Sequence, residues 1–401
     1  MSIFIYILQI LQMILMVYLA IAVMYYFIYA FASAFTHKIN PPQSTGKNKF
    51  VVLIPGYKED MVIVDVAKEA LNQDFPSEYY DVVVIADSFR KETLDKLYEL
   101  PLTVNVVSFE KSSKSKAINK TLKDLPDDKY DAVMILDADN VMANDVLTKM
   151  NDALNAGYTS IQGHRLAKNT DTPFALLDAI SEEINNYIFR KGHRVLGISS
   201  ALIGSGMAFR YKLYKQIMAT IDSYGEDKEL EFKLLEKGHK IEYIHDALIY
   251  DEKVSVSKAF VRQRARWLFN QVLYARRFFW SGIKQLFTKG NVDYFDKMFQ
   301  QFLPPRIILI GLTTLLTVGS FFYNNFSLTI LWLVIFILSV SAFILAVPRK
   351  FYTLRTFKAL LHLPYGFLLM LKSLSQLQVA RKGFGATAHT VNSKNKKDNN
   401  K

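Results

Sequence analysis

The 401-residue sequence contains no cysteine. This absence excludes disulfide bonds, thiolate metal sites and a cysteine nucleophile, so a bound metal must take oxygen or histidine ligands. Proline is also sparse, at 11 residues, while 51% of the residues are hydrophobic. This high apolar content predicts folded structure rather than disorder. The length is sufficient for one large domain or two ordinary ones.

Acidic residues are nearly absent from the last third of the chain. Residues 256–401 contain 21 lysines and arginines but only 3 acidic residues, a balance of +18, whereas residues 47–255 carry a balance of −7. A basic segment indicates contact with nucleic acid or with a membrane surface. This segment is also strongly apolar and carries no nucleic-acid-binding motif, so we expect membrane lipid as a partner and no nucleic acid.

Charged side chains are missing altogether from residues 3–35, which predicts a transmembrane anchor within residues 1–36. The alternative is a cleaved signal peptide, which the small residues 32–34 would suit. No lysine or arginine precedes the run, however, and the run is far longer than the apolar part of a signal peptide. Basic residues follow it, which places the N-terminus outside and the next domain in the cytoplasm, on an integral protein of the cytoplasmic (inner) membrane.

Two later apolar runs, residues 307–323 and 327–347, predict a transmembrane hairpin over residues 306–348. Basic residues at both ends of the hairpin return the chain to the cytoplasm. Residues 349–380 stay open between an interfacial helix and a third late membrane helix. Residues 381–401 predict a basic, disordered tail.

Residues 47–255 alternate between strand and helix patterns. Apolar, β-branched runs at residues 49–57, 80–88, 102–109 and 130–139 predict strands, with helical patterns between them. This alternation predicts an α/β domain with a mostly parallel sheet covered by helices on both faces. Ligands of such domains bind beyond the carboxyl ends of the strands. The polar residues expected there are Tyr57, Glu59, Asp87, Asp137 and Asp139.

Asp137 and Asp139 stand two positions apart after the fourth predicted strand. Their carboxylates offer oxygen ligands to a hard divalent cation, Mg²⁺ or Mn²⁺, although such pairs also occur in ordinary turns. Lys114 and Lys116 open a predicted helix, where cations and backbone N–H groups meet phosphate, or form a solvated basic turn.

Three further stretches extend this set. Gly204, Ser205 and Gly206 permit close approach of the backbone to a ligand, or form an ordinary turn. Glu226 and Asp227 begin an amphipathic helix, where helix capping alone would also favour them. Residues 256–305 predict amphipathic helices lying on the membrane. The polar and aromatic residues that stand together in the first of these helices are Gln263, Arg264, Arg266 and Trp267.

Taken together, the sequence resembles the membrane-integrated family 2 glycosyltransferases, the group that includes cellulose, hyaluronan and poly-N-acetylglucosamine synthases. The resemblance covers residues 49–270 and is carried, in family order, by LIPGYKE, Asp87, KAIN, DAD, GSGMAFR, GED and QRARW, of which the last is the most specific. It implies a GT-A fold, which is Rossmann-like with a mostly parallel sheet, inserted between transmembrane helices.

The resemblance also implies a role for each residue. Asp227 would be the general base, with Glu226 beside it, and Asp139 and Asp137 would hold the metal. The nucleotide-sugar donor would be bound by Tyr57, Glu59, Asp87, Lys116 and Asp137. The diphosphate and the acceptor would be contacted by Gln263, Arg264, Arg266, Trp267, Gly204, Ser205 and Gly206.

The implied activity is an inverting transfer of a sugar from a nucleotide sugar, a UDP-sugar, to a growing surface polysaccharide, assisted by Mg²⁺ or Mn²⁺. The small membrane part favours a second possibility, single transfer to a lipid or lipid-linked acceptor. Two other classes stay open: a non-catalytic membrane scaffold with a GT-A fold, and a membrane-bound nucleotidyltransferase. The scaffold has no need of the intact acidic residues, and the nucleotidyltransferase needs more glycines than the one in IPGYKED.

Overall fold

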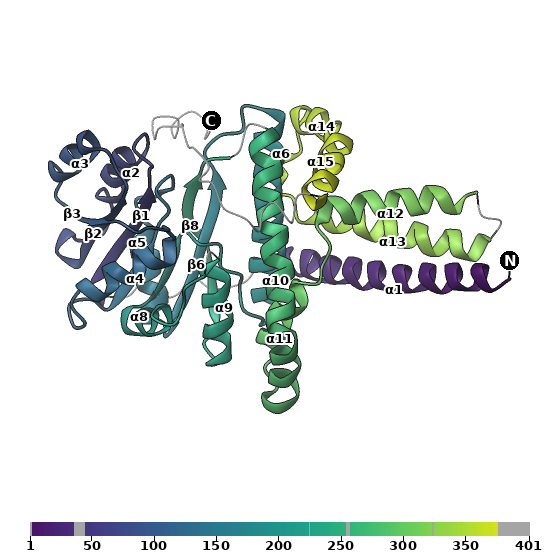
Figure 1. Ribbon diagram of the computed structural model, residues 1–401, viewed down its shortest axis with the longest axis horizontal. Coiled ribbons are helices and arrows are strands. Elements are labelled where there is room, and N and C mark those ends of the chain that lie inside the picture. The colour runs from purple at the N-terminus through teal and green to yellow at the C-terminus, as the bar shows by residue number, and fades with distance from the viewer. Residues whose placement is uncertain (1, 36–44, 224, 254–256, 323–324, 376–401) are drawn as a thin grey trace.

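The structure is a computed structural model that describes residues 2–35, 45–223, 225–253, 257–322 and 325–375. Figure 1 shows an α/β domain on the left and three long helices that project to the right. Helices α6, α10 and α11 stand between these two parts.

The four strands predicted from the sequence form one half of the sheet. They are β1 (Phe50–Tyr57), β2 (Tyr80–Asp87), β3 (Thr103–Val107) and β4 (Ala132–Ile135). They lie in the order β3-β2-β1-β4, and every pairing among them is parallel. The predicted parallel arrangement is therefore confirmed for this half.

The other half of the sheet is mixed, which corrects the expectation of a mostly parallel sheet. Its strands are β7 (Met207–Arg210), β6 (Ser160–Ala167), β8 (Ile241–Asp251) and β5 (Val141–Met142), in that spatial order beyond β4. β7 runs antiparallel to both β4 and β6, and β5 runs antiparallel to β8, while β6 and β8 are parallel. The two short strands β7 and β5, which run against the direction of their neighbours, are the physical reason for the mixture.

Helices cover both faces of the sheet. One face packs against α2 (Ile63–Ala70), α3 (Lys91–Tyr98) and α5 (Val146–Asn155), and the other against α4 (Lys114–Asp124), α8 (Tyr211–Met218) and α9 (Glu226–Glu236). A short 3-10 turn, η1 (Ser77–Tyr79), precedes β2. β1 shows why the layers form, because the side chains of its first five residues, 50–54, are buried and enter the two cores alternately.

Five helical segments connect the α/β domain to the long helices. They are α6 (Pro173–Asn185), η2 (Asn186–Gly192), α7 (His193–Val195), α10 (Ser257–Lys289) and α11 (Val292–Gln300). Pro173 at the first position of α6 and the Thr172 side chain, which accepts a hydrogen bond from the backbone of Ala175, fix where this helix begins. α10 packs along α11 and α15, and α11 also contacts α9.

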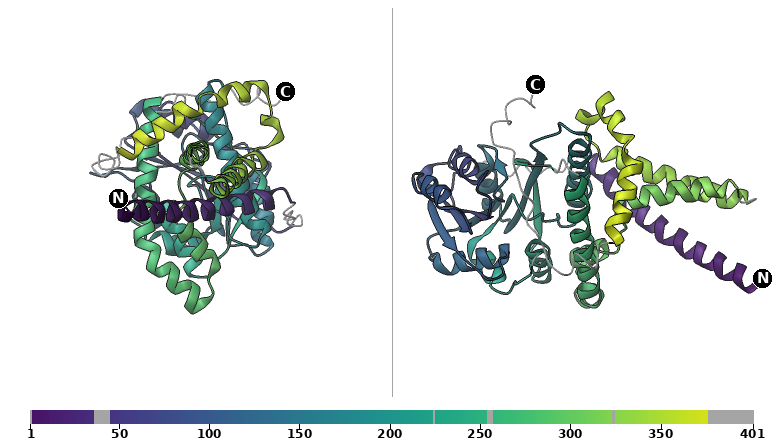
Figure 2. Two further views of the ribbon diagram at one scale, coloured as in Figure 1. Left: turned by 90° about the vertical axis from the view of Figure 1, so that its right-hand side faces the viewer. Right: turned by 45° about the horizontal axis from the view of Figure 1, so that its top comes forward.

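The three projecting helices are α1 (Ser2–Ser33), α12 (Arg306–Ser320) and α13 (Phe326–Leu345). By length and composition, residues 6–33 and 326–345 could each cross a membrane, whereas the 15-residue α12 is shorter. Many of their large apolar side chains are exposed. Figures 1 and 2 show that the N-terminal end of α1 points the same way as the end of the hairpin where α12 leads into α13.

The last described segments lie across the base of these helices (Figure 2). η3 (Arg349–Phe351) and α14 (Leu354–Leu360) follow α13, with α14 on α6, and α15 (Leu363–Ser375) contacts both α10 and α12. α14 and α15 have 7 and 13 residues, fewer than the about 20 that a membrane span needs. The choice between an interfacial helix and a third late membrane helix for residues 349–380 stays a prediction. The predicted tail lies outside the described residues.

Candidate active site

Polar side chains gather at one edge of the sheet. β1 lies between β2 and β4, and all three are parallel, so their carboxyl ends share an edge. Tyr57 ends β1 directly opposite Asp87, which ends β2. Asp137 follows two residues after the end of β4. The structure thus places these strand-end residues at the edge where the sequence predicted a ligand site.

Lys114, the first residue of α4, joins groups from three parts of the chain. Its ammonium Nζ lies 2.5 Å from Oδ1 of Asp137 and 3.4 Å from Oε1 of Glu226. It also donates a 2.6 Å hydrogen bond to the carbonyl oxygen of Gly204. The start of α4, the loop after β4, the loop before β7 and the first turn of α9 therefore converge on one cation.

The charges of this cluster shift the pKa values of its members. Burial raises the pKa of Glu226 to about 7, with Lys114 opposing the shift and the charge of Asp227 adding to it. Burial likewise raises the pKa of Asp137, against Lys114 and with a contribution from Asp139. Burial lowers the pKa of Lys114, but the charges of Asp137 and Glu226 outweigh it, so the net shift is upward. Lys114 thus serves several carboxylates at once, and the cluster suits a further positive charge.

The loop from Gly204 to Gly206 holds the cluster in place. Gly204 and Gly206 have φ angles of +84° and +66°, a region that favours glycine. The hydroxyl oxygen of Ser205 accepts a 2.9 Å hydrogen bond from the backbone N–H of Asp137. A Cβ at Gly204 would lie 3.7 Å from Oδ2 of Asp227. The loop therefore positions the strand-end acid and lets the first turn of α9 approach closely.

Asp139 lies deeper, with 8% of its surface exposed. The side-chain amide of Asn140 donates one 2.9 Å hydrogen bond to Oδ1 of Asp139 and another to Oδ1 of Asp251. The ammonium of Lys168 donates to the backbone carbonyl of Asp139. Lys253 pairs with Asp251 at 2.7 Å. Asn140, which sequence reasoning missed because an amide after an acid is common in turns, orients this carboxylate.

The turns after β1 and β2 are tied together. The backbone N–H of Lys58 donates a 3.1 Å hydrogen bond to the carbonyl oxygen of Asp87, whose buried carboxylate accepts a 2.9 Å bond from the hydroxyl of Ser88. Lys58 and Ser88 have φ angles of +57° and +61°, and strained backbone of this kind clusters at functional sites. Tyr57 is 40% exposed beside them, so its ring is accessible to a ligand, and Glu59 is half-buried.

One face of α10 lies against the acid cluster. Arg266 is largely buried, which lowers its pKa, while the charges of Asp227 and Glu226 act in the opposite direction. Two turns further on, the hydroxyl of Tyr274 donates a 2.9 Å hydrogen bond to the carbonyl oxygen of Gly225. The predicted arginine therefore lies within electrostatic range of the acids at the start of α9.

The opposite face of α10 carries Arg264 and Trp267. Two positions turn a helix by about 200°, so Arg264 points away from Arg266. Its guanidinium pairs with Asp178 at 2.6 Å and lies 4.3 Å from the centre of the Trp267 ring. The structure thus separates residues that the sequence motif groups together. The side chain of Gln263 lies outside the described residues.

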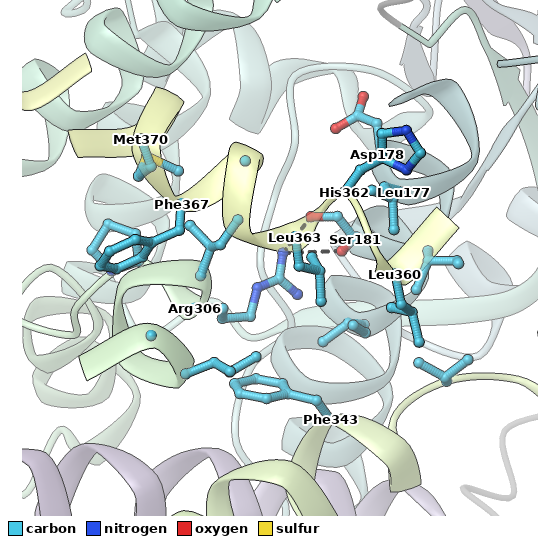
Figure 3. Close-up of a pocket in the computed structure, with 18 of the residues that line it drawn as sticks. Leu177, Asp178, Ser181, Arg306, Phe343, Leu360, His362, Leu363, Phe367 and Met370 are labelled. Atoms are coloured by element: carbon cyan, nitrogen blue, oxygen red, sulfur yellow. Dashed lines mark hydrogen bonds between the residues drawn. The ribbon is translucent and has the colours of Figure 1, made fainter. Parts of the chain in front are cut away.

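Arg264 and Trp267 line a cavity of about 1490 Å³ between α6, α10, α12, α13, α14 and α15. Its lining is predominantly apolar, with side chains from both the connecting helices and the projecting ones (Figure 3). No sequence pattern indicates this cavity, because its walls come from helices that are distant in the chain.

Lys116 is not among the residues brought together. Its ammonium donates a 3.3 Å hydrogen bond to the carbonyl oxygen of Lys111, whereas Lys114 enters the acid cluster. The predicted contact of Lys116 with the diphosphate stays a prediction.

Asp137 and Asp139 fit a hard divalent cation. Within the described part of the chain, no group of three histidine or acidic side chains is arranged to hold an ion. Two carboxylates nevertheless suit Mg²⁺, which is often bound by one or two carboxylates together with water and substrate phosphate. Burial is the main cause of the raised pKa of Asp137, and the charge of Asp139 adds to it; an ion held by the two carboxylates would relieve this repulsion.

Comparisons with known proteins agree with this geometry. The chain is 23% identical over 315 residues to the probable glycosyltransferase YdaM of Bacillus subtilis, covering 73% of this chain and 72% of that protein. It is 24% identical over 228 residues to a beta-monoglucosyldiacylglycerol synthase of Nostoc, covering 54% of this chain and 47% of the synthase, so it matches about half of that relative's length.

A solved structure shares the fold. The mannosyltransferase PcManGT of Pyrobaculum calidifontis, solved in complex with GDP-Man and Mn²⁺, superimposes with a TM-score of 0.50 at 16% identity, covering 90% of this chain and 98% of that one. Residues 47–270, more than half of the chain, match the family described as glycosyltransferase like family 2. The chain therefore belongs to glycosyltransferase family 2, and it is a glycosyltransferase with a GT-A-like α/β domain.

Proposed function

We propose that the protein transfers a sugar, with inversion, from a UDP-sugar to an acceptor at the cytoplasmic face of the membrane, assisted by Mg²⁺ or Mn²⁺. One observation carries the proposal. Lys114, Asp137, Glu226 and Asp227, from separate parts of the chain, converge at the carboxyl edge of the sheet, inside the residues that match the family.

The donor side of the site is proposed at the ends of β1 and β2. Tyr57, Glu59 and Asp87 would bind the nucleoside, since an exposed ring beside fixed carboxylates suits a base and a ribose. The names of the related structure and of others with this type of domain include GDP-Man and UDP-GlcNAc, which supports a nucleotide-sugar donor.

The chemistry needs one base and no covalent nucleophile. A divalent cation at Asp137 and Asp139 would neutralise charge on the departing diphosphate. Asp227 would accept the proton of the acceptor hydroxyl. The acceptor oxygen then bonds to the anomeric carbon as that carbon's bond to the diphosphate breaks. The diphosphate leaves with the electron pair beside Lys114 and Arg266, whose positive charges stabilise its negative charge.

The membrane location is proposed from the projecting helices and the charge. The long apolar α1 and α13, with their exposed side chains, and the basic residues 256–401 fit anchoring in a membrane with anionic lipid on the cytoplasmic side.

For the acceptor, the cavity beside Trp267 favours a lipid or lipid-linked molecule. Its mostly apolar walls would leave the hydroxyls of a glycan chain without hydrogen-bond partners, which costs free energy. The lipid product named for the Nostoc relative points the same way. A growing surface polysaccharide is the second candidate, favoured by the 41% exposed ring of Trp267 within QRARW, which offers a flat face to a sugar.

The proposal is tested with the purified full chain in nanodiscs, radiolabelled UDP-sugars and a lipid extract. We expect sugar transfer that requires Mg²⁺ or Mn²⁺, and a loss of about 100-fold or more in Asp139→Asn and in Asp227→Asn. A lipid-soluble product indicates single transfer, and a ladder of long products indicates a polysaccharide. Full turnover in both variants would refute the assigned chemistry, and Asp95→Asn, at an exposed position of α3, serves as the control.

A further inference from the structure

Arg306 places a positive charge in a cavity whose lining is predominantly apolar. It is the first residue of α12, and Figure 3 shows its guanidinium among the apolar side chains of the lining. Its Nη2 donates hydrogen bonds of 2.7 Å and 3.1 Å to the hydroxyl and carbonyl oxygens of Ser181. Its Nη1 is fully buried and, within the described residues, has no hydrogen-bond partner.

The carboxylates of Asp178 and Glu182, whose charges act on Arg306, are engaged elsewhere: Glu182 pairs with Arg165 at 2.9 Å. Asp178, which also lines the cavity, pairs with Arg264 at 2.6 Å. No acidic side chain in the described part of the chain lies within ion-pair distance of Arg306, and both of its recorded partners are neutral oxygens of Ser181. Leaving a guanidinium in apolar surroundings without an anion is costly, so the arrangement suits an anionic ligand.

The size and lining of the cavity define the rest of that ligand. Its volume of about 1490 Å³ exceeds the roughly 300–1,000 Å³ of a typical small-molecule pocket. Beyond Arg306 most of the walls are hydrocarbon and aromatic, with a smaller number of polar side chains such as Asp178 and Arg264. Among the apolar residues are Leu177, Ile310, Phe343, Leu363, Phe367 and Met370. A molecule that fits both the guanidinium of Arg306 and the apolar walls carries one anionic group and long hydrocarbon chains.

We propose that this cavity binds an anionic lipid, with a phosphate group at Nη1 of Arg306 and the hydrocarbon chains along α12 and α15. The basic balance of residues 256–401 complements such a ligand. The lipid comes from one of two sources, a lipid phosphate that serves as acceptor or a phospholipid of the bilayer. The acceptor source rests on the proposed function, whereas binding itself does not.

Binding is measured on the delipidated full chain in neutral detergent by native mass spectrometry, without nucleotide sugar. The probes are phosphatidylglycerol and diacylglycerol with the same acyl chains, so that they differ only in the phosphate headgroup. We expect phosphatidylglycerol to bind the wild type and Arg306→Gln to weaken it by about tenfold to a hundredfold, the worth of a charged hydrogen bond. Diacylglycerol should bind weakly and equally to both proteins.

Matched variants keep the test informative if Arg306→Gln folds poorly. Arg276→Gln removes an exposed arginine from α10 and should bind phosphatidylglycerol like the wild type. Arg306→Lys keeps the charge but loses the fork of donors, so its affinity should fall between those of wild type and Arg306→Gln. Ile310→Trp fills the cavity one turn from Arg306 and should weaken binding with the arginine intact.

The two sources are separated with a polyprenyl phosphate and radiolabelled UDP-sugar. Label on the polyprenyl phosphate, or on phosphatidylglycerol, identifies the bound lipid as acceptor, while binding without label identifies a bilayer lipid, and both support the proposal. Asp139→Asn should bind phosphatidylglycerol normally even though it transfers no sugar. Equal binding of phosphatidylglycerol by wild type and Arg306→Gln, or equal binding of the two probes, would overturn the inference while leaving the glycosyltransferase function standing.

Discussion

At the scale of single residues, Lys114 determines how much negative charge the candidate site can hold. Its ammonium touches Asp137 and the carbonyl of Gly204 and lies 3.4 Å from Glu226. Without it, these carboxylates would face one another across a partly buried space, where repulsion is stronger than in water. The lysine is thus a structural counter-ion as well as a candidate contact for phosphate.

Replacing Lys114 by methionine should destabilise the fold by about 2 kcal/mol, because carboxylates that had a charged hydrogen-bond partner lose it. Thermal unfolding in detergent at pH 8 measures the change. The loss should be smaller at pH 5, where Glu226, with a pKa of about 7, already holds a proton. Lys116→Met, which removes an ammonium bonded only to the carbonyl of Lys111 in the described residues, should change the unfolding midpoint little. Equal losses in the two variants would contradict this role.

Glu226 predicts a specific dependence of stability on pH. Its pKa is about 7 in the folded protein and 4.5 for the free side chain. Between these values the folded state holds a proton that the unfolded state has released, so the free energy of unfolding falls as the pH rises, by roughly 1.4 kcal/mol per pH unit. Stability from this group is complete below pH 4.5 and lost by about pH 7.

The variant Glu226→Gln has no such proton to lose. Its unfolding midpoint should therefore fall less than that of the wild type between pH 5 and pH 8, as followed by thermal unfolding. Glu78→Gln, at an exposed position, should follow the wild type. Parallel profiles for wild type and Glu226→Gln would show that the carboxyl keeps an ordinary pKa.

The sequence predicted which residues would lie near the candidate site, but not which of their side chains contact one another. The sequence placed Lys114 and Lys116 at one helix start and the acids at strand ends, because strand and cap patterns are local. Which lysine enters the cluster depends on the rotation of α4 about its axis, and two positions differ by about 200°. The same rotation on α10 separates Arg264 from Arg266. Residues of the QRARW motif, which the sequence suggested act at one place, therefore lie on two faces of the helix.

At the scale of elements, the loop before β7 links the sheet to the site. Gly206 has a φ of +66°, and a Cβ there would lie 2.6 Å from Cγ1 of Ile249 on β8. Its backbone N–H donates a 2.8 Å hydrogen bond to the carbonyl oxygen of Ile135, at the end of β4. A shift of this loop would move Ser205, which holds the backbone of Asp137.

Gly206→Ala should therefore cost about 3 kcal/mol, from backbone strain and steric overlap together, and should lower sugar transfer. Gly157→Ala is the matched control, because Gly157 also has a positive φ, of +98°, but nothing within 4 Å of an added Cβ. It should cost only about 1 kcal/mol. Chemical denaturation compares the two, and Ile249→Ala should restore part of the Gly206→Ala loss. A larger effect at Gly157 would contradict the steric argument.

Elements were predictable where apolar residues run together. β1, β2 and β4 match the predicted runs because each is largely buried on both faces and reads as a continuous apolar stretch, whereas the more exposed edge strand β3 is indicated by its β-branched residues. β6 and β8 were not predicted because they carry polar residues near their ends, such as Arg165 and Asp251. These two residues lie 3.6 Å apart in an ion pair. β7 has four residues, and nothing in so short a segment reveals that it runs antiparallel.

At the scale of the whole molecule, the absence of cysteine makes the proposed orientation testable. A single cysteine at Phe322→Cys, an 86% exposed position at the end of α12, should react with a membrane-impermeant maleimide on intact cells. A cysteine at Lys123→Cys, exposed on α4, should react only after lysis. The cysteine-free wild type is the control. Labelling of both positions in intact cells, or the reverse pattern, would refute a cytoplasmic α/β domain.

α10 has one more consequence, which concerns communication between ligands. On this one continuous helix, Arg266 and Tyr274 face the acids, while Arg264 and Trp267 face the cavity proposed to bind lipid. A rigid helix rotates as a whole. A ligand in the cavity that rotates α10 therefore also moves the side chains that face the acid cluster. Thermodynamic linkage then requires reciprocity: whatever factor a seated lipid adds to nucleotide affinity, the nucleotide returns to the lipid.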